Sequence, residues 1–506
     1  MTDFDPRDQA AYAAIQSKLI PLWKSIERLS NDEQTIVVVP SVDIDVEMTA
    51  SEMQAYEERY LFLLLLLRQP RARMVYVTGQ AINPDIVDYY LDLMPGVLTS
   101  HARSRLFLLS PIEATWRPLT NKILERPKLI DRISSLITDK DRAHLVPFMT
   151  TWADRELAMR LGIPMYGADP ADAHFGTKTE GRQIFAEVGI PHPAGREGLS
   201  SKEDVAVAIA SLRAANRDIA AVVIKHDEGV PGFGNATVRL SSLPEQGDAS
   251  EHDEIMAELD ALKIAVPGES TAEYFEVLEQ EGGIVEELTE ADDLRSPSVQ
   301  LRITPLGDVE LLSTHDQILG GESGQLFIGS RFPADPAYAT LISTHASAVG
   351  ARLAERGVIG RFAIDFVVFR NGNSPWEAQA IELNLRKGGT THPFLTLQFL
   401  TDGNYDAGTA TFQAPSGLQK FYVASDHVAI DGLRTLTPRD VLDIALIHGL
   451  HFDQARQVGS VFHMLSILPE HGQLGLTSVG DSPAEAQQRY EEVVAVLTSE
   501  VSATTK

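Results

Sequence analysis

The chain has 506 residues, a net charge of −28 at neutral pH and no cysteine, and this length predicts two to four structural units. The excess of acidic residues argues against broad binding to nucleic acid or anionic membranes, since both require a surface rich in Lys and Arg. Without cysteine, disulfides, thiolate nucleophiles and Cys-ligated metal centres are excluded.

The first residues do not have the pattern of a targeting segment. Residues 1–6 are acidic and lack the apolar stretch of a signal peptide. Residues 61–67 form an apolar run, but its length is only about a third of the roughly 20 residues that a membrane-spanning helix needs. We therefore expect a buried helix at residues 61–67 and a cytoplasmic protein.

Residues 1–170 are expected to form an open, mostly parallel α/β sheet. The β-branched runs at residues 35–42 and 73–78 predict strands, and between them Thr49 has the capping-box spacing that begins a helix. The alternation continues with a strand at residues 105–109 and an amphipathic helix at residues 120–137. The sequence has no GxGxxG after these strands and no P-loop motif, so neither a dinucleotide fold nor a P-loop nucleotidase is supported.

The middle of the chain offers two lysines and a glycine-rich hairpin. Residues 171–188 predict a helical region that contains Lys178, and residues 218–225 predict a buried strand that ends in Lys225. The Lys225 side chain either reaches into a cleft or is simply solvated at the strand end. Residues 229–235 carry three glycines, and their backbone N–H groups could close over phosphates, although an ordinary β-turn has the same composition.

A short strand, a hairpin and a helix follow. Residues 283–288 predict a strand that contains Glu286 and Glu287. A hairpin formed by residues 298–304 and 309–319 carries His315 and Gln317 near its end. Residues 337–356 predict a helix that Gly357 ends.

The densest chemistry lies in a predicted hairpin formed by residues 360–369 and 376–385. Side chains two apart on a strand share a face, so Glu382, Asn384 and Arg386 should point the same way. On the partner strand Asp365 interrupts an apolar run, where an unpaired carboxylate would be costly to bury. Two carboxylates and an amide oxygen suit Mg²⁺. The alternative is a solvated strand face with an incidental salt bridge.

The composition changes after about Gly408. Residues 437–447 predict a helix, residues 460–468 a strand and residues 482–497 a terminal helix with Pro483 at its first position. We expect either a small separate α/β unit or a lid packed on the main body.

The order of these features resembles the ATP-grasp superfamily of carboxylate-activating ligases over residues 170–400. The fold class implied is α/β (α+β), with an N-terminal α/β domain at 1–170, an ATP-grasp domain at 171–407 and a small C-terminal domain at 408–506. Within the second, a lid-like part would span about 190–285 and metal-bearing strands 296–395. The chain looks closest to the pheganomycin-type peptide ligases, on residues 296–300, 313–317, 332–334, 386–393, 461–465 and 480–486.

The resemblance implies an ATP site. Lys178 and Lys225 would contact the phosphates, the loop at residues 229–235 would close over the γ-phosphate, and Glu286 would bind the adenine amino group. The acid that binds the ribose stays open among Glu290, Asp292 and Asp293. The full ATP-binding set implied is Lys178, Lys225, Gly232, Gly234, Asn235, Glu286, Glu287 and Leu288, the last two through their backbone.

The resemblance also implies a metal site and a substrate site. Asp365, Glu382 and Asn384 would hold Mg²⁺ or Mn²⁺, and Arg386 and Lys225 would act in catalysis. Substrate contacts are expected from His315, Gln317, Arg386, Thr390 and His392.

The activity implied is ATP-dependent ligation of a carboxylate to an amine through an acylphosphate, with release of ADP and phosphate. The expected partners are small molecules, amino acids or short peptides among them, with no nucleic acid and no membrane; a homo-oligomer is left open. Two alternatives are an ATP-dependent small-molecule kinase and a non-catalytic ATP-binding regulator. The sequence does not name the acid or the amine, because substrate pockets are set by loop side chains.

Overall fold

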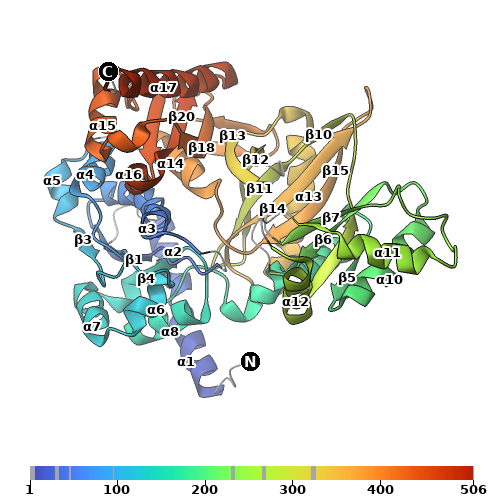
Figure 1. Ribbon diagram of the computed structural model, residues 1–506. Coiled ribbons are helices and arrows are strands. Elements are labelled where there is room, and N and C mark those ends of the chain that lie inside the picture. The colour runs from blue at the N-terminus through green and yellow to red at the C-terminus, as the bar shows by residue number, and fades with distance from the viewer. Residues whose placement is uncertain are drawn as a thin grey trace.

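A computed structural model describes residues 6–28, 33–44, 47–94, 96–228, 234–264, 269–320 and 326–504. It is a mixed helix and strand protein with three main sheets (Figure 1). Within the described ranges, no helix is long and apolar enough to cross a membrane.

The N-terminal sheet is parallel, as predicted. Its order is β3 (Leu106–Leu109), β2 (Ala72–Val77), β1 (Gln34–Val39) and β4 (Ala143–Pro147). Every residue of β1 is buried, because apolar clusters cover both faces of the sheet. The sequence analysis did not predict β4.

The segment between β1 and β2 is helical, as predicted, but it is divided into two helices. Thr49 and Glu52 form the expected capping box at the start of α3 (Ala50–Glu58). The apolar run then forms a 3-10 helix, η1 (Leu61–Arg68), and not an α-helix. It is apolar all round and is therefore buried on nearly every side.

The remaining N-terminal helices cover the two faces of the sheet. The predicted helix at 120–137 is in fact two helices, because Pro127 begins a new one. The full set of remaining N-terminal helices is α1 (Pro6–Gln16), α2 (Leu19–Arg28), α4 (Pro84–Asp92), α5 (Thr99–Arg103), α6 (Leu119–Leu124), α7 (Pro127–Leu136) and α8 (Trp152–Leu161), with the 3-10 turn η2 (Lys140–Arg142).

A smaller antiparallel subdomain, green in Figure 1, projects to one side. Its strand order is β5 (Gly195–Leu199), β9 (Gly283–Glu287), β6 (Ala221–His226), β7 (Asn235–Arg239) and β8 (Lys263–Ile264). The helices α10 (Lys202–Ala215), α11 (Glu251–Asp260) and α12 (Thr271–Glu281) pack on it around a core of its own. The predicted helical region 171–188 is divided at Thr177 into η3 (Pro170–Gly176) and α9 (Lys178–Glu187).

The large sheet carries the predicted metal-bearing hairpin. Its order is β10 (Asp293–Arg295), β14 (Gly360–Arg370), β11 (Pro297–Ile303), β12 (Val309–Gly320), β13 (Leu326–Phe332), β18 (Phe421–Ala429), β20 (Gln473–Gly480) and β19 (Gly459–His463), with β15 (Glu377–Asn384) paired to β14. The helix α13 (Pro336–Glu355) packs against β11 and β12. The β14–β15 hairpin agrees with the prediction.

The C-terminal strands are not a separate sheet, which corrects one of the two expectations for this region. Strand β18 pairs antiparallel with β13, so β18, β20 and β19 extend the large sheet. Their apolar residues share one core with the N-terminal domain, below them in Figure 1. The other elements here are α14 (Thr391–Thr401), β16 (Asn404–Asp406), β17 (Thr411–Gln413), η4 (Leu433–Thr435), α15 (Pro438–Ile447), η5 (Leu465–Ile467), α16 (Leu468–His471) and α17 (Pro483–Thr504).

Candidate active site

The β14–β15 hairpin brings the three predicted metal ligands together. Asp365 on β14 lies directly opposite Glu382 on β15. Asn384 donates a hydrogen bond from Nδ2 to Asp365 Oδ2 over 3.2 Å. The amide nitrogen is thus used on Asp365, which leaves the amide oxygen as the atom that can bind a metal. This oxygen and the two carboxylates are hard ligands of the kind that Mg²⁺ prefers.

Charge is divided unequally between the two carboxyl groups. Burial, reinforced by the charge of Glu382, raises the pKa of Asp365 to about 7. Burial also opposes ionisation of Glu382, but Lys178 and Arg386 outweigh it and hold the pKa of Glu382 below its ordinary value. A divalent cation would offset the repulsion between two facing carboxyl groups, so these residues fit a divalent metal ion.

The start of α9 holds Lys178 at this cluster. Its Nζ lies 2.9 Å from Glu382 Oε1. Thr177 caps the helix, and Asp227, which follows β6, accepts the Thr179 N–H on its carboxylate over 2.8 Å and the Lys178 N–H on its carbonyl oxygen over 3.2 Å. These bonds fix the lysine to the end of β6.

Lys225 takes part in a buried ion-pair network. Its Nζ pairs with Glu286 Oε1, and Arg182 Nη1 donates to Glu286 Oε2 over 2.7 Å. Arg182 also pairs through Nε with Glu197 at 2.7 Å. Glu286 is only 1% exposed, and the cations of Lys225 and Arg182 balance its buried charge. Lys225 and Glu286, both predicted to bind ATP, are thus ion-pair partners of each other, and neither is among the residues that line the cavity described next.

A cavity of about 760 Å³ adjoins the metal-ligand cluster. This volume is in the range of ligand pockets. The predicted residues among those that line it are Lys178, Gly234, Glu382, Asn384 and Arg386. The N-terminal domain contributes Asp43, Ile44, Met149 and Thr150 to its wall. The cavity is thus formed by all three sheets or their connecting loops.

Comparison with known families identifies the domain that carries this hairpin. Residues 269–408, which include Asp365, Glu382 and Asn384, match the family model described as IQCH-like, ATP-grasp. The chain contains an ATP-grasp domain. Residues 440–493 match the family model described as PGM1 C-terminal domain.

Two curated proteins are similar to most of the chain. L-propargylglycine--L-glutamate ligase from Streptantibioticus cattleyicolor is 29% identical over 450 residues, which cover 87% of this chain and 89% of the ligase. IQ motif-containing protein H from Danio rerio is 23% identical over 532 residues and covers 95% of this chain. The alignment spans about half, 50%, of that second relative.

Solved ATP-grasp structures share the fold. The biotin carboxylase of Campylobacter jejuni, in its beta-gamma-ATP complex, has a TM-score of 0.54 at 11% identity, and the match covers 94% of this chain and 96% of that chain. An N5-carboxyaminoimidazole ribonucleotide synthetase in its ADP complex has a TM-score of 0.51 at 11% identity, covering 92% and 96% of the two chains. At this level of identity the likeness concerns the fold alone.

The backbone of the predicted adenine edge in the ATP-grasp domain is already hydrogen-bonded. The Glu287 N–H donates to the Ala194 carbonyl over 2.8 Å, and the Leu288 N–H donates to the Ala221 carbonyl over 3.0 Å. The prediction was an adenine contact through the backbone of Glu287 and Leu288, and a contact through the Leu288 N–H would require this second bond to break. These two bonds use the N–H groups of Glu287 and Leu288 and leave their carbonyl oxygens as the backbone atoms that can accept from a ligand.

Arg386 lies beside the cluster but not on the strand. Strand β15 ends at Asn384, so the predicted continuation of the strand face to Arg386 is corrected. The side chain still lines the cavity, and its charge lowers the pKa of both Asp365 and Glu382. A bend after Asn384 thus keeps the guanidinium near the metal ligands although the chain has left the sheet.

The glycine-rich loop is described only at its end. Gly234 lines the cavity with φ +74°, and a Cβ built there would lie 3.0 Å from His226 Nδ1, so the position favours glycine. Asn235 is the first residue of β7. Gly232, with the rest of residues 229–233, lies outside the described residues.

Of the predicted substrate residues in the ATP-grasp domain, Gln317 lies at the metal cluster and donates to Asp365 Oδ1 over 3.0 Å. Three others are not among the residues that line the cavity. His315 is buried between Phe332 and Tyr422, and burial lowers its pKa to about 3. Thr390 bonds the buried side chain of Gln300.

The third predicted substrate residue that does not line the cavity is His392. Its side chain is buried and lies within hydrogen-bonding distance of His463 and Asp426. All three side chains are buried and do not line this cavity, and their substrate contacts stay predictions.

Sequence reasoning missed two residues that organise this site. Arg182 shares Glu286 with Lys225, and Asp227 joins α9 to β6. Arg182 had a signal, since it lies four residues after Lys178 and therefore on the same side of a helix. For Asp227, the only signal in the sequence was its position just after the end of the predicted strand.

Proposed function

We propose that the protein is an ATP-dependent carboxylate–amine ligase that works through an acylphosphate. The observation that carries this proposal is the convergence, on one cavity of about 760 Å³, of Lys178, Arg386 and the Glu382–Asn384 metal-ligand strand. Cations and hard metal ligands around one cavity suit the positioning and charge neutralisation that phosphoryl transfer requires.

The residues would divide the work as follows. Lys178 and Lys225 would bind the ATP phosphates, and Arg386 would grip the carboxylate and then the acylphosphate through two parallel hydrogen bonds. The substrate carboxylate oxygen attacks the γ-phosphorus and ADP leaves. The amine then attacks the acyl carbon, loses a proton and expels phosphate, so that one amide forms for each ATP cleaved.

Asp365, Glu382 and Asn384 would hold Mg²⁺ or Mn²⁺. When bound, the ion would offset the negative charge of the phosphates. Gln317 would hold the Asp365 carboxylate in place through its 3.0 Å hydrogen bond.

Amino acids are the proposed substrates, since the similar ligase from Streptantibioticus cattleyicolor is named for joining L-propargylglycine to L-glutamate. The domain limits 1–170, 171–407 and 408–506 and a cytoplasmic location belong to the same proposal. The oligomeric state is left open.

The test is release of ADP by purified protein with ATP, Mg²⁺ and pairs of amino acids, together with the mass of the product. L-Glutamate paired in turn with small apolar amino acids is the first set to try. ADP release that requires both partners and yields their amide supports ligation. ADP release without an amine, with a phosphorylated product, would indicate a kinase, and ATP binding without turnover on any pair would favour the regulator.

A further inference from the structure

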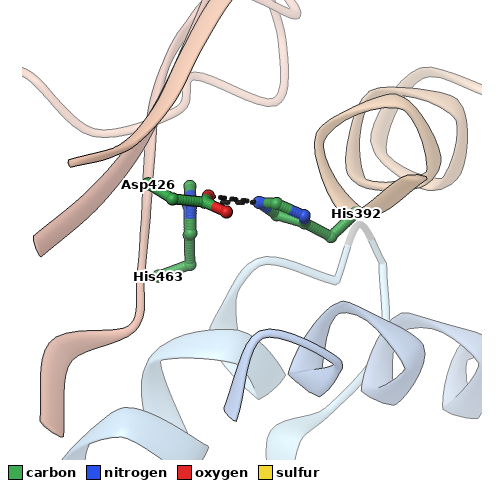
Figure 2. A group of neighbouring side chains, drawn as sticks. All are labelled: His392, Asp426 and His463. Atoms are coloured by element: carbon green, nitrogen blue, oxygen red, sulfur yellow. Dashed lines mark hydrogen bonds and ion pairs between the residues drawn. The ribbon is translucent and has the colours of Figure 1, made fainter. Parts of the chain in front are cut away.

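Three polar side chains meet in the interior, away from the cavity of the ATP site. His392 lies in the first turn of α14, Asp426 on β18 and His463 at the end of β19. All three are at most 5% exposed. Figure 2 shows the two imidazole rings approaching the Asp426 carboxylate from different elements. The proposed mechanism uses none of them.

Their ligand atoms form a nearly equilateral triangle. Asp426 Oδ1 lies 3.0 Å from His392 Nε2 and 2.9 Å from His463 Nε2, and the two nitrogens are 3.0 Å apart. Hydrogen bonding alone satisfies this triangle poorly. If both nitrogens carry hydrogen, two N–H groups crowd one oxygen; if one does not, its lone pair faces the carboxylate oxygen.

A metal ion removes this conflict, because all three atoms can then direct lone pairs at one cation. Three ligands on one face of an octahedron, each about 2.1 Å from the ion, are about 3.0 Å apart, whereas tetrahedral ligands at that distance are about 3.4 Å apart. The observed spacings agree with the octahedral face. Two histidines and one carboxylate in this arrangement are a known ligand set for divalent iron and its neighbours.

We propose that His392, Asp426 and His463 bind a divalent first-row transition-metal ion. Arg59 supports this assignment, since its Nη1 donates to Asp426 Oδ2 over 2.8 Å and leaves Oδ1 for the ion. The guanidinium is itself buried, above the rings of Tyr56 and Phe148. Because Arg59 already balances the charge of Asp426, the imidazoles must supply most of the affinity, which favours transition metals over Mg²⁺.

The site would join three parts of the chain. Arg59 follows α3 of the N-terminal domain, and His392 lies in the first turn of α14, just after the loop that carries Arg386. The other two ligands, Asp426 and His463, belong to the C-terminal strands. A bound ion would therefore hold α14 against the two C-terminal strands and fix the end of the loop that leaves the active site, while Arg59 ties Asp426 to the N-terminal domain. Its role would be structural, and it is separate from the hard-oxygen site at Asp365 and Glu382.

The experiment is metal analysis of the intact protein. Protein stripped with a chelator is dialysed against Zn²⁺, Fe²⁺, Mn²⁺ or Co²⁺ in the presence of excess Mg²⁺, which keeps the hard-oxygen site filled. We expect one transition-metal ion per chain, a rise of several degrees in the melting temperature on reloading, and visible absorption bands of six-coordinate Co²⁺.

Substitutions test whether the ion binds at this cluster. His392→Gln and His463→Gln should each lower bound metal at least tenfold and remove the shift in melting temperature, whereas His345→Gln, a half-buried histidine on α13, should change neither. Folding of each variant is checked by circular dichroism before metal is added. Retention of metal by both cluster variants, loss of metal in Glu382→Gln, or no transition metal on the folded wild-type chain would overturn the proposal.

Discussion

The Nζ of Lys178 lies 2.9 Å from Glu382 Oε1, so a predicted phosphate ligand and a predicted metal ligand are ion-pair partners. Side-chain exposures of 8% and 14% mean that water screens the pair little. Binding of a nucleotide with its metal would have to redistribute this pair, with the lysine turning to phosphate and the carboxylate to the cation. The first prediction concerns this carboxylate.

Glu382→Gln should abolish turnover and leave the fold intact, because an amide has nearly the same shape but no charge for a metal. Turnover is measured as ADP release, and the fold by circular dichroism and melting temperature. Wild-type turnover should also require Mg²⁺ or Mn²⁺. Full activity in excess chelator would contradict the assignment.

Lys225→Ala should weaken ATP binding by about 10- to 150-fold, the equivalent of a charge-assisted hydrogen bond of about 1.5–3 kcal/mol. The fold should survive, because Arg182 still balances Glu286 at 2.7 Å. Calorimetric titration with ATP measures the change. Lys202→Ala is the matched control, since that lysine pairs with Asp260 on the surface of the same subdomain. Equal affinities in the wild type and Lys225→Ala would rule out the role.

Arg386→Lys should lower turnover by about 100-fold or more, as loss of an oxyanion-stabilising donor does, with near-normal ATP affinity. A lysine keeps the charge but loses the planar pair of donors. Turnover and affinity are measured separately. Arg370→Lys, at the far end of β14 where Arg370 pairs with Asp293, is the control and should change neither. Unchanged turnover in Arg386→Lys would leave Arg386 a structural residue.

Stability should fall as pH rises from about 4.5 to 8, in part through Glu57. Burial raises its pKa from 4.5 to about 8, so in this window the folded state keeps a proton that the unfolded state has released. Glu57→Gln retains an acceptor for the Gly79 N–H, which the carboxylate accepts over 2.6 Å. The variant should therefore raise the melting temperature more at pH 8 than at pH 5. An equal change at both pH values would mean that Glu57 does not titrate in this range.

Local patterns predicted the elements that depend on neighbours in sequence. Thr49 and Glu52 are three residues apart, and the β14–β15 hairpin joins adjacent strands, so capping and turn chemistry sufficed. Two features could not be predicted in this way. The pairing of Lys225 with Glu286 and Arg182 depends on packing between distant segments, and the burial of His315 was missed because a polar residue in a motif gives no sign of it.

The junction of β13 with β18 has a consequence for how the chain can be divided. At Gly329, an added Cβ would lie 2.2 Å from the Ala424 carbonyl oxygen, so the two backbones approach closely there. A chain that stopped near residue 408 would leave β13 as a bare sheet edge with its hydrogen-bonding groups exposed. Such a fragment should self-associate, and an evolutionary loss of the C-terminal strands would need a replacement strand or a charged, shortened β13 to remain monomeric.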